Sequence, residues 1–247
     1  MSHTIKVLDH GFVTLRNLAG PTRRTGMTAH DVVNNTPLRD FDADDTDVAN
    51  AARMSFSGSD QERTYEMEMK LARYLKKNHH DTPFECIVVW LEMKMPIFIA
   101  RQFVRHRTQA INEVSGRYVT LPAEWYIPEV VGAAAKDKKQ GQADGLDVEV
   151  QAWFKRQLHD ACARDYETYL EAMKRGVAPE HSRSLLHVNH YTHWMTCFSL
   201  RNLFHFLALR DHPHAQVEAQ AYAKAIIQLL EPHLPGLMAI FAESREG

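Results

Sequence analysis

The stretch CIVVWLEMKMPIFIARQFVRH, residues 86–106, decides how the chain is expected to fold. Residues 86–95 are apolar and then alternate with polar ones, which predicts a strand with one well-buried face. Pro96 follows at the first turn of the next element, where its missing N–H costs nothing. Residues 97–106 are therefore predicted to form a helix that starts directly from the strand.

Toward the N-terminus, residues 4–16 predict two short strands that flank Asp9-His10-Gly11. Residues 46–56 predict a short helix. Ser59 and Glu62 form a capping-box pattern, which predicts a helix that begins there and runs to about Lys77.

Toward the C-terminus, residues 131–146 are small and charged and predict a mobile surface insertion. The further predicted elements are a helix over about 147–175 that ends at Gly176, a short helix opened by Pro179, a strand within 186–197, a helix capped by Ser199 that runs to Leu209, and helices over 214–231 and 235–245. The fold class predicted from these elements is α+β, a single domain over residues 1–247 that is mostly helical with a small antiparallel sheet.

Composition narrows the class of protein. Apolar residues make up 45% of the chain, charged residues 24%, and the net charge is −2, which is typical of a globular protein without a general affinity for nucleic acid. Three widely spaced cysteines without a C-x-x-C pair argue against a disulfide framework or a thiolate zinc site. With no signal-peptide pattern and no membrane-length apolar run, we expect a cytoplasmic protein.

Three arginines, Arg101, Arg105 and Arg107, fall within seven residues. On a helix, Arg101 and Arg105 would share a face beside apolar residues, where a guanidinium needs a partner. Phosphate is a natural partner, because its oxygens match the guanidinium fork. The alternative is a solvated basic helix end that complements the helix dipole.

The segment NEVSGRY, residues 112–118, combines amide, carboxylate, hydroxyl, glycine and guanidinium groups. Gly116 would let backbone N–H groups approach a ligand closely. Glu113 can accept hydrogen bonds from a hydroxyl or a base N–H. These features favour a binding segment, although an ordinary turn is the alternative.

Arg105-His106-Arg107, then seven residues, then Ser115 resembles the signature of the flavin-dependent thymidylate synthases. The resemblance extends in order over AARMSF at 51–56, HDTPFE at 80–85, RQFVRHR at 101–107, NEVSGRY at 112–118, VAPEHSR at 177–183 and SLRNLFHFLALRDHPHAQ at 199–216. The chain departs from the family where Ser199 and His205 replace a common Asn, which leaves the flavin contacts there less secure.

The resemblance implies the fold of that family and its reaction. The reaction is reductive methylation of dUMP to dTMP, with methylenetetrahydrofolate as carbon donor and NADPH-reduced FAD as hydride source. The family also implies a homotetramer whose active sites are shared between subunits.

By resemblance, the residues that contact dUMP are Gln102, Arg105, Glu113, Ser115, Gly116, Arg117, Arg183 and Arg210. Those that contact FAD are Ser55, His80, Thr82, Arg105, His106, Arg107, Asn112, Glu113, Ser199, Arg201, His205 and His214. Arg183 would reach the nucleotide from another subunit, unless it simply pairs with Glu180. Arg210 would stabilise negative charge on the pyrimidine, unless it pairs with Asp211.

Arg210 and Ser115 are thus the candidate catalytic residues. For Ser115 a binding role is favoured over nucleophilic attack, because the sequence places no His or Lys to activate it. Cys86, Cys162 and Cys197 lie outside the polar segments, so packing roles are expected for all three.

Other classes of function are weaker. His187, His190 and His193 are spaced by three, which on a strand puts successive side chains on opposite faces, so no metal site is expected. An RNA-binding module would use the arginines of 101–117 with Tyr118, Trp125 and Tyr126 as stacking platforms, but the net charge opposes it. No G-x-G-x-x-G pattern follows a strand, which disfavours a Rossmann dehydrogenase.

Overall fold

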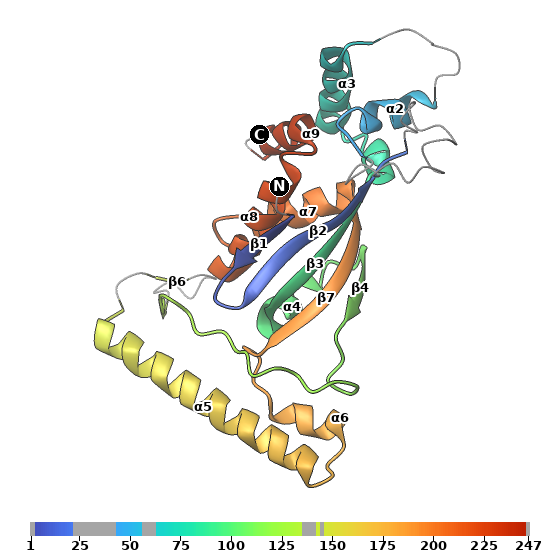
Figure 1. The fold of residues 1–247 in the computed structure, drawn as a ribbon. Coiled ribbons are helices and arrows are strands. Elements are labelled where there is room, and N and C mark those ends of the chain that lie inside the picture. The colour runs from blue at the N-terminus through green and yellow to red at the C-terminus, as the bar shows by residue number, and fades with distance from the viewer. Residues whose placement is uncertain (1–2, 22–42, 56–62, 135–141, 144–145, 246–247) are drawn as a thin grey trace.

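The computed structural model describes residues 3–21, 43–55, 63–134, 142–143 and 146–245. Its centre is an antiparallel sheet in which neighbouring strands follow the order β1-β2-β3-β7-β4 (Figure 1). The strands are β1 (Thr4–Val7), β2 (Gly11–Ala19), β3 (Val88–Pro96), β4 (Gln109–Glu113) and β7 (Tyr191–Ser199). The predicted antiparallel sheet is confirmed, and β4 forms one of its edges.

Strand β3 carries the alternation that its sequence predicts. One face is fully buried through Val89, Leu91, Met93 and Met95, and the residues between them are only partly covered. Because β3 pairs with both β2 and β7, it holds the middle of the sheet.

Three helices pack on the same face of the sheet (Figure 1): α4 (Ile97–Phe103), α7 (Leu200–Arg210) and α8 (Val217–Leu230). Phe103 of α4 joins them, since its ring lies 4.8 Å from that of Phe206 in α7 and 6.1 Å from that of Tyr222 in α8. Helix α7 begins where predicted, because the Ser199 hydroxyl accepts a hydrogen bond from the N–H of Asn202 at 3.4 Å.

At one end of the sheet lie α2 (Asp47–Arg53), α3 (Tyr65–Lys77), the 3₁₀ helix η1 (Thr82–Cys86) and α9 (Pro235–Glu243) (Figure 1). The start predicted for α3 at Ser59 lies outside the described residues. The helix begins at Tyr65, because the Thr64 hydroxyl accepts from the N–H of Met67 at 3.3 Å and caps it there.

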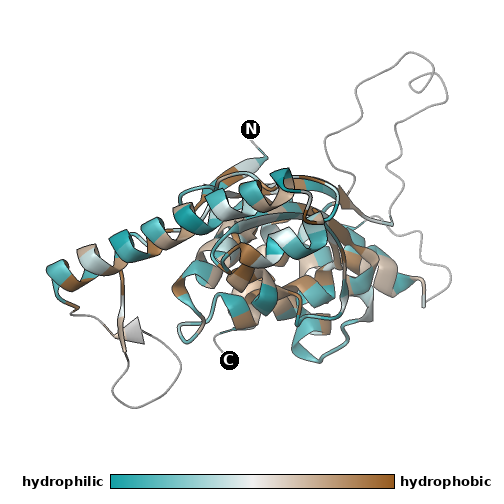
Figure 2. Cartoon of the chain, turned by 90° about the horizontal axis from the view of Figure 1, so that it is seen from below, coloured by the Kyte–Doolittle hydropathy of each residue, from teal (hydrophilic) through white to brown (hydrophobic). Residues whose placement is uncertain are grey.

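The long helix α5 (Val148–Lys174) is confirmed and is followed by α6 (Pro179–Ser182) and the 3₁₀ helix η2 (Arg183–Leu185). It lies apart from the sheet in Figure 1, and only Cys162 and Tyr169 along it are buried. Hydrophilic and hydrophobic residues alternate along the helix in Figure 2. The predicted insertion at 131–146 contains a short antiparallel pair, β5 (Ala133–Ala134) with β6 (Gln142–Ala143), which the sequence did not predict.

Within the described ranges, no helix is both long enough and apolar enough to cross a membrane.

Candidate active site

The turn after α4 places the arginine cluster differently from the prediction. Helix α4 ends at Phe103, so Arg105 and Arg107 lie on the turn to β4 and Arg105 does not share a helix face with Arg101. The turn is fixed by Gln109, whose side-chain amide donates to the carbonyls of Phe103 at 2.8 Å and His106 at 3.0 Å. These bonds tie the last residue of the helix to His106 on the turn that follows it.

A cleft of about 310 Å³ lies between the segment that follows the end of β4 and the α6–η2 segment. Its lining residues are Ile97, Glu113, Val114, Ser115, Gly116, Leu121, Arg183, Leu186 and Thr192. Four predicted dUMP contacts therefore meet in one place, namely Glu113, Ser115, Gly116 and Arg183. The sequence did not predict the apolar wall or Thr192, although the alternation along β7 marks Thr192 as inward-facing.

Arg183 is the one cation that lines this cleft. Gly116 makes room for it, because a Cβ at that position would lie 3.3 Å from the Leu121 side chain and 3.4 Å from Cδ of Arg183. The alternative pairing of Arg183 with Glu180 is wrong, since Glu180 pairs with Arg117 at 3.2 Å. Arg183 makes no ion pair in the described part of the chain, so its guanidinium is available to an anion.

The lining of the cleft also includes a carboxylate and hydroxyl groups. The Glu113 carboxylate accepts a hydrogen bond from the hydroxyl of the buried Thr192. The Ser115 hydroxyl accepts one from the backbone N–H of Arg117 at 3.3 Å, which orients it at the start of the turn. The cleft thus presents a carboxylate, a hydroxyl and a guanidinium around an apolar patch.

Arg210 forms a second group at the end of α7. Its Nε–H donates to Nε2 of His106 at 2.9 Å, and Nη2–H donates to the carbonyl of Gln102 at 3.1 Å. The alternative pairing with Asp211 is wrong, because Asp211 pairs with Arg245 at 2.6 Å.

His106 is suited to accept this bond because it stays neutral. Its burial, together with the nearby Arg210 and His205, lowers the pKa of His106 from 6.5 to about 4. With Nε2 accepting, the proton of the neutral ring is on Nδ1.

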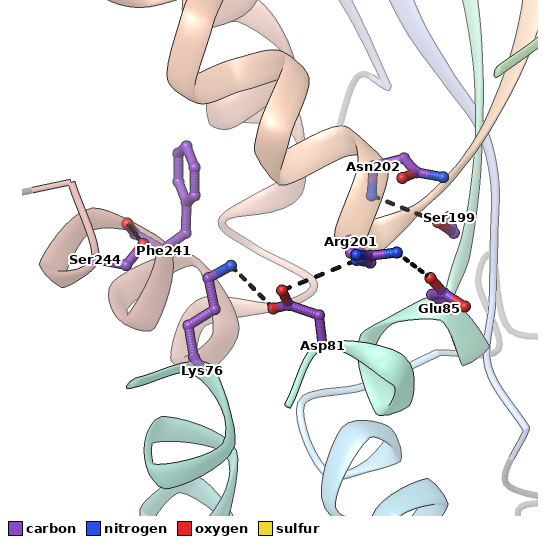
Figure 3. Close-up of polar contacts among 8 residues, drawn as sticks. All are labelled: Lys76, Asp81, Glu85, Ser199, Arg201, Asn202, Phe241 and Ser244. Carbon is purple, nitrogen blue, oxygen red and sulfur yellow. Dashed lines mark hydrogen bonds and ion pairs between the residues drawn. The ribbon is translucent and has the colours of Figure 1, made fainter. Parts of the chain in front are cut away.

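A third group surrounds η1 and contains several predicted FAD contacts. Arg201 donates to the Glu85 carboxylate at 2.6 Å and lies 3.9 Å from that of Asp81, which also pairs with Lys76 at 3.3 Å (Figure 3). These ion pairs hold the His80–Thr82 loop beside the start of α7, where Ser199 caps the helix.

The remaining predicted FAD contacts are dispersed. Ser55 is exposed just after α2, Asn112 is exposed on the edge strand β4, and His214 follows α7 with its ring 5.1 Å from that of His212. His205 lies near the second group, 6.1 Å from the ring of His106. Arg105 and Arg107 are exposed, make no ion pair among the described residues, and do not line the cleft.

The histidines of 187–193 have separate partners. His187 lies 2.6 Å from the Asp165 carboxylate, His193 lies 2.7 Å from that of Glu92, and the buried His190 stacks on Tyr166. Only His193 lies within β7, so the prediction that all three share a strand is wrong.

One other expectation is corrected, and the RNA-binding alternative loses one of its residues. Cys86 is exposed at the end of η1, so a packing role is wrong for it, whereas Cys162 is buried and Cys197 half-buried. Tyr126 is buried and hydrogen-bonded to Glu218 at 3.2 Å, so it is no surface platform for stacking bases.

The chain resembles known proteins along most of its length. Residues 37–236 match the model of the family described as thymidylate synthase complementing protein. A flavin-dependent thymidylate synthase of Gluconobacter oxydans is 40% identical over 228 residues, covering 90% of this chain and 75% of that protein. One from Thermus thermophilus is 36% identical over 241 residues, covering 97% and 78%. A UMP/dUMP methylase from Streptomyces cacaoi, solved with 5-Br dUMP, superposes with a TM-score of 0.80 at 25% identity, covering 98% and 99%.

Proposed function

Because the chain belongs to the flavin-dependent thymidylate synthases, we propose that the cleft around Ser115 and Arg183 binds dUMP for methylation to dTMP. The protein is an enzyme of dTMP biosynthesis that uses FAD, with NADPH and methylenetetrahydrofolate as co-substrates. The observation that carries the assignment of the cleft is the unpaired Arg183 guanidinium beside Ser115 and Gly116.

The cleft suits the phosphate of a nucleotide. Arg183 offers a planar fork to its oxygens, and the Ser115 hydroxyl and Gly116 backbone line the same cleft. Arg105 is proposed to contribute further positive charge from the turn between α4 and β4. Arg117 has a role only if it exchanges its exposed ion pair with Glu180 for the phosphate, which costs little because surface pairs contribute about 0–1 kcal/mol.

Arg210 is proposed to face the pyrimidine ring. His106 and the Gln102 carbonyl use two of its five N–H donors, which fixes the orientation of the guanidinium and leaves three for the substrate. A fixed positive charge next to a pyrimidine carbonyl stabilises the negative charge that develops there when hydride reaches the ring. Gln102 is proposed to assist from α4, and Ser115 to bind rather than to attack.

The residues present fit FAD. Arg105 and Arg107 are exposed guanidinium groups without ion-pair partners in the described ranges, as an anionic pyrophosphate requires. His80, Thr82, Ser199 and Arg201 supply polar groups around η1, and His106 and His205 supply rings near Arg210. When bound, FAD supplies the hydride, while these residues hold and orient it.

A homotetramer with shared sites is part of the proposal. Its support is the spread of the proposed FAD residues over separate places on this chain, which a second copy would complete. Helix α5 further supports it, because Val150 and Trp153 are 45% and 56% exposed. The three free thiols support a reducing, cytoplasmic location.

The direct test is the absorbance spectrum of the purified protein, followed by an assay of dTMP formed from dUMP, methylenetetrahydrofolate and NADPH. We expect a bound flavin and NADPH oxidation coupled to dTMP. No flavin after reconstitution, or no dTMP, would contradict the proposed function.

A further inference from the structure

A second cavity, of about 250 Å³, lies between α4, α5 and the start of α8 and shares no lining residue with the cleft. It is lined by Phe98, Tyr126, Pro128, Val130, Val131, Gly132, Phe154, Leu158, Asn189 and Glu218. The two cavities are separated by α4, since Ile97 lines the cleft and the adjacent Phe98 lines the second cavity.

Glu218 is the feature that distinguishes this cavity. Its side chain is buried, with the residue 7% exposed, although it carries a carboxylate. Oε1 accepts a hydrogen bond from the Tyr126 hydroxyl at 3.2 Å, whereas Oε2 is buried and has no hydrogen-bond partner. A buried carboxylate oxygen without a hydrogen-bond donor destabilises the folded state, and a ligand that supplies a donor would remove this penalty.

The neighbouring polar groups are already satisfied by the protein. The Asn189 amide donates to the Tyr126 carbonyl at 2.9 Å, and its oxygen accepts from the Cys162 thiol at 3.4 Å. Among the described polar groups that line this cavity, Glu218 Oε2 is therefore the acceptor without a hydrogen-bond partner. A ligand that binds to it must supply a hydrogen-bond donor.

The electrostatic environment favours a donor that is positively charged. Burial, Glu218, Asp9 and Glu129 together raise the pKa of the Tyr126 hydroxyl well above its usual range, so it remains a donor to Glu218. Three carboxylates thus act on the same ring. Lys155 of α5 is bound to the backbone carbonyl of Glu129 rather than to Glu218.

The walls are apolar and partly aromatic. The rings of Phe98 and Tyr126 lie 6.0 Å apart with a tilt of 44°, and Phe154 and Leu158 of α5 face them across the cavity. Aromatic faces beside a carboxylate suit an organic cation, which gains ring contacts as well as the ion pair. The volume is below the roughly 300 Å³ at which drug-sized ligands begin, so the ligand is small.

We propose that this cavity is a second ligand site, distinct from the dUMP cleft, that takes a small organic ammonium ion with an aromatic or aliphatic body. The ammonium group bonds to Glu218 Oε2, and the body packs between Phe98 and Phe154. The site does not depend on the role assigned to the cleft.

The test uses benzylamine, which is a cation at neutral pH, and benzyl alcohol, a neutral donor of the same shape. Both are titrated into the flavin-bound protein with saturating dUMP present, and binding is measured by calorimetry or ligand-observed NMR. We expect saturable binding of benzylamine, and binding of benzyl alcohol that is about tenfold weaker or more. Equal affinities, or no saturable binding of benzylamine, would overturn the proposal.

Two variants locate the site. Glu218→Gln removes the charge with the same shape and is expected to weaken benzylamine binding about tenfold or more. Glu231→Gln, an exposed position at the other end of α8, is the matched control and is expected to change nothing. Equal losses in both variants, or no loss in Glu218→Gln, would contradict the assignment.

Val131→Trp provides an independent check in case Glu218→Gln disturbs α8. It fills the cavity from a half-exposed wall position and leaves the carboxylate in place. We expect it to abolish benzylamine binding while dTMP formation continues at the wild-type rate. Unchanged benzylamine binding would overturn the proposed site.

Discussion

Arg210 and His106 are joined by a hydrogen bond of 2.9 Å between Nε and Nε2 across 104 positions of sequence. The bond places a neutral imidazole under a guanidinium, so the charge of Arg210 is oriented without being neutralised. A carboxylate at the same place would have cancelled part of that charge. The hydrogen bond brings together an arginine and a histidine that lie far apart in the chain.

Replacing His106 by Phe removes the acceptor of the Arg210 Nε–H and leaves the guanidinium held by the Gln102 carbonyl alone. We expect kcat for dTMP formation to fall by at least about tenfold, with a smaller change in KM for dUMP. The reason is that a misplaced catalytic group slows the chemical step more than it weakens substrate binding. His106→Gln, which keeps an acceptor, should recover part of the loss. His159→Phe on α5 is the control, and a KM effect alone in His106→Phe would refute the positioning role.

The pH dependence of stability follows from the same residue. His106 has a pKa of about 4 in the folded protein against 6.5 in the unfolded chain, so its contribution to stability is present above pH 6.5 and is lost as pH falls toward 4. We expect Tm to decline more steeply between pH 6.5 and 4 in the wild type than in His106→Gln. Parallel Tm profiles would contradict burial of a neutral His106.

The Arg105→Ala variant tests the arginine on the turn. Its side chain is exposed and makes no ion pair in the described ranges, so the fold should not change. We expect dUMP affinity to fall about tenfold or more, the effect of losing a charge-assisted hydrogen bond to phosphate. Arg101→Ala on α4 is the matched control. If calorimetry gives both variants the wild-type affinity for dUMP, Arg105 does not contact the nucleotide.

Asp45 stabilises the C-terminal helix. Its carboxylate is buried, accepts from the backbone N–H groups of Gly236 and Leu237 at 2.8 Å each, and accepts from the Tyr65 hydroxyl at 2.6 Å. We expect Asp45→Ala to lower the free energy of unfolding by about 3 kcal/mol or more, and Tyr65→Phe by about 1 kcal/mol. Urea titrations in which Asp45→Ala lowers the free energy of unfolding no more than Tyr65→Phe does would contradict the capping role of Asp45.

Local pattern predicted the elements of the fold well. The alternation in 86–95 and the cap at Ser199 correspond to β3 and α7 in the structure. The start of α3 and the end of α4 were misplaced, because Thr64 supplies the cap of one and Gln109 closes the other from beyond the helix. Such contacts depend on the folded chain and leave little trace in periodicity.

The sequence named candidate residues for the site, but it did not predict which of them lie together in the folded chain. Residues 113–116 and Arg183 of the same chain line one cleft, although the resemblance implies that Arg183 reaches the nucleotide from another subunit, and Arg210 lies with His106 elsewhere. Leu121 and Leu186 were missed because an apolar wall made from distant loops has no sequence signature. Likewise, Glu180 pairs with Arg117 and not with Arg183 because of how the folded chain brings these residues together, which the sequence alone does not show.

The central claim is that Arg183 and its neighbours in the cleft hold the phosphate of dUMP. Its most direct test is calorimetric titration of dUMP into the wild type, Arg183→Ala and the control Arg175→Ala, whose side chain pairs only with Glu171 on the surface of α5. We expect Arg183→Ala to bind dUMP at least about tenfold more weakly and Arg175→Ala to bind it as the wild type does. Wild-type affinity in Arg183→Ala would contradict it.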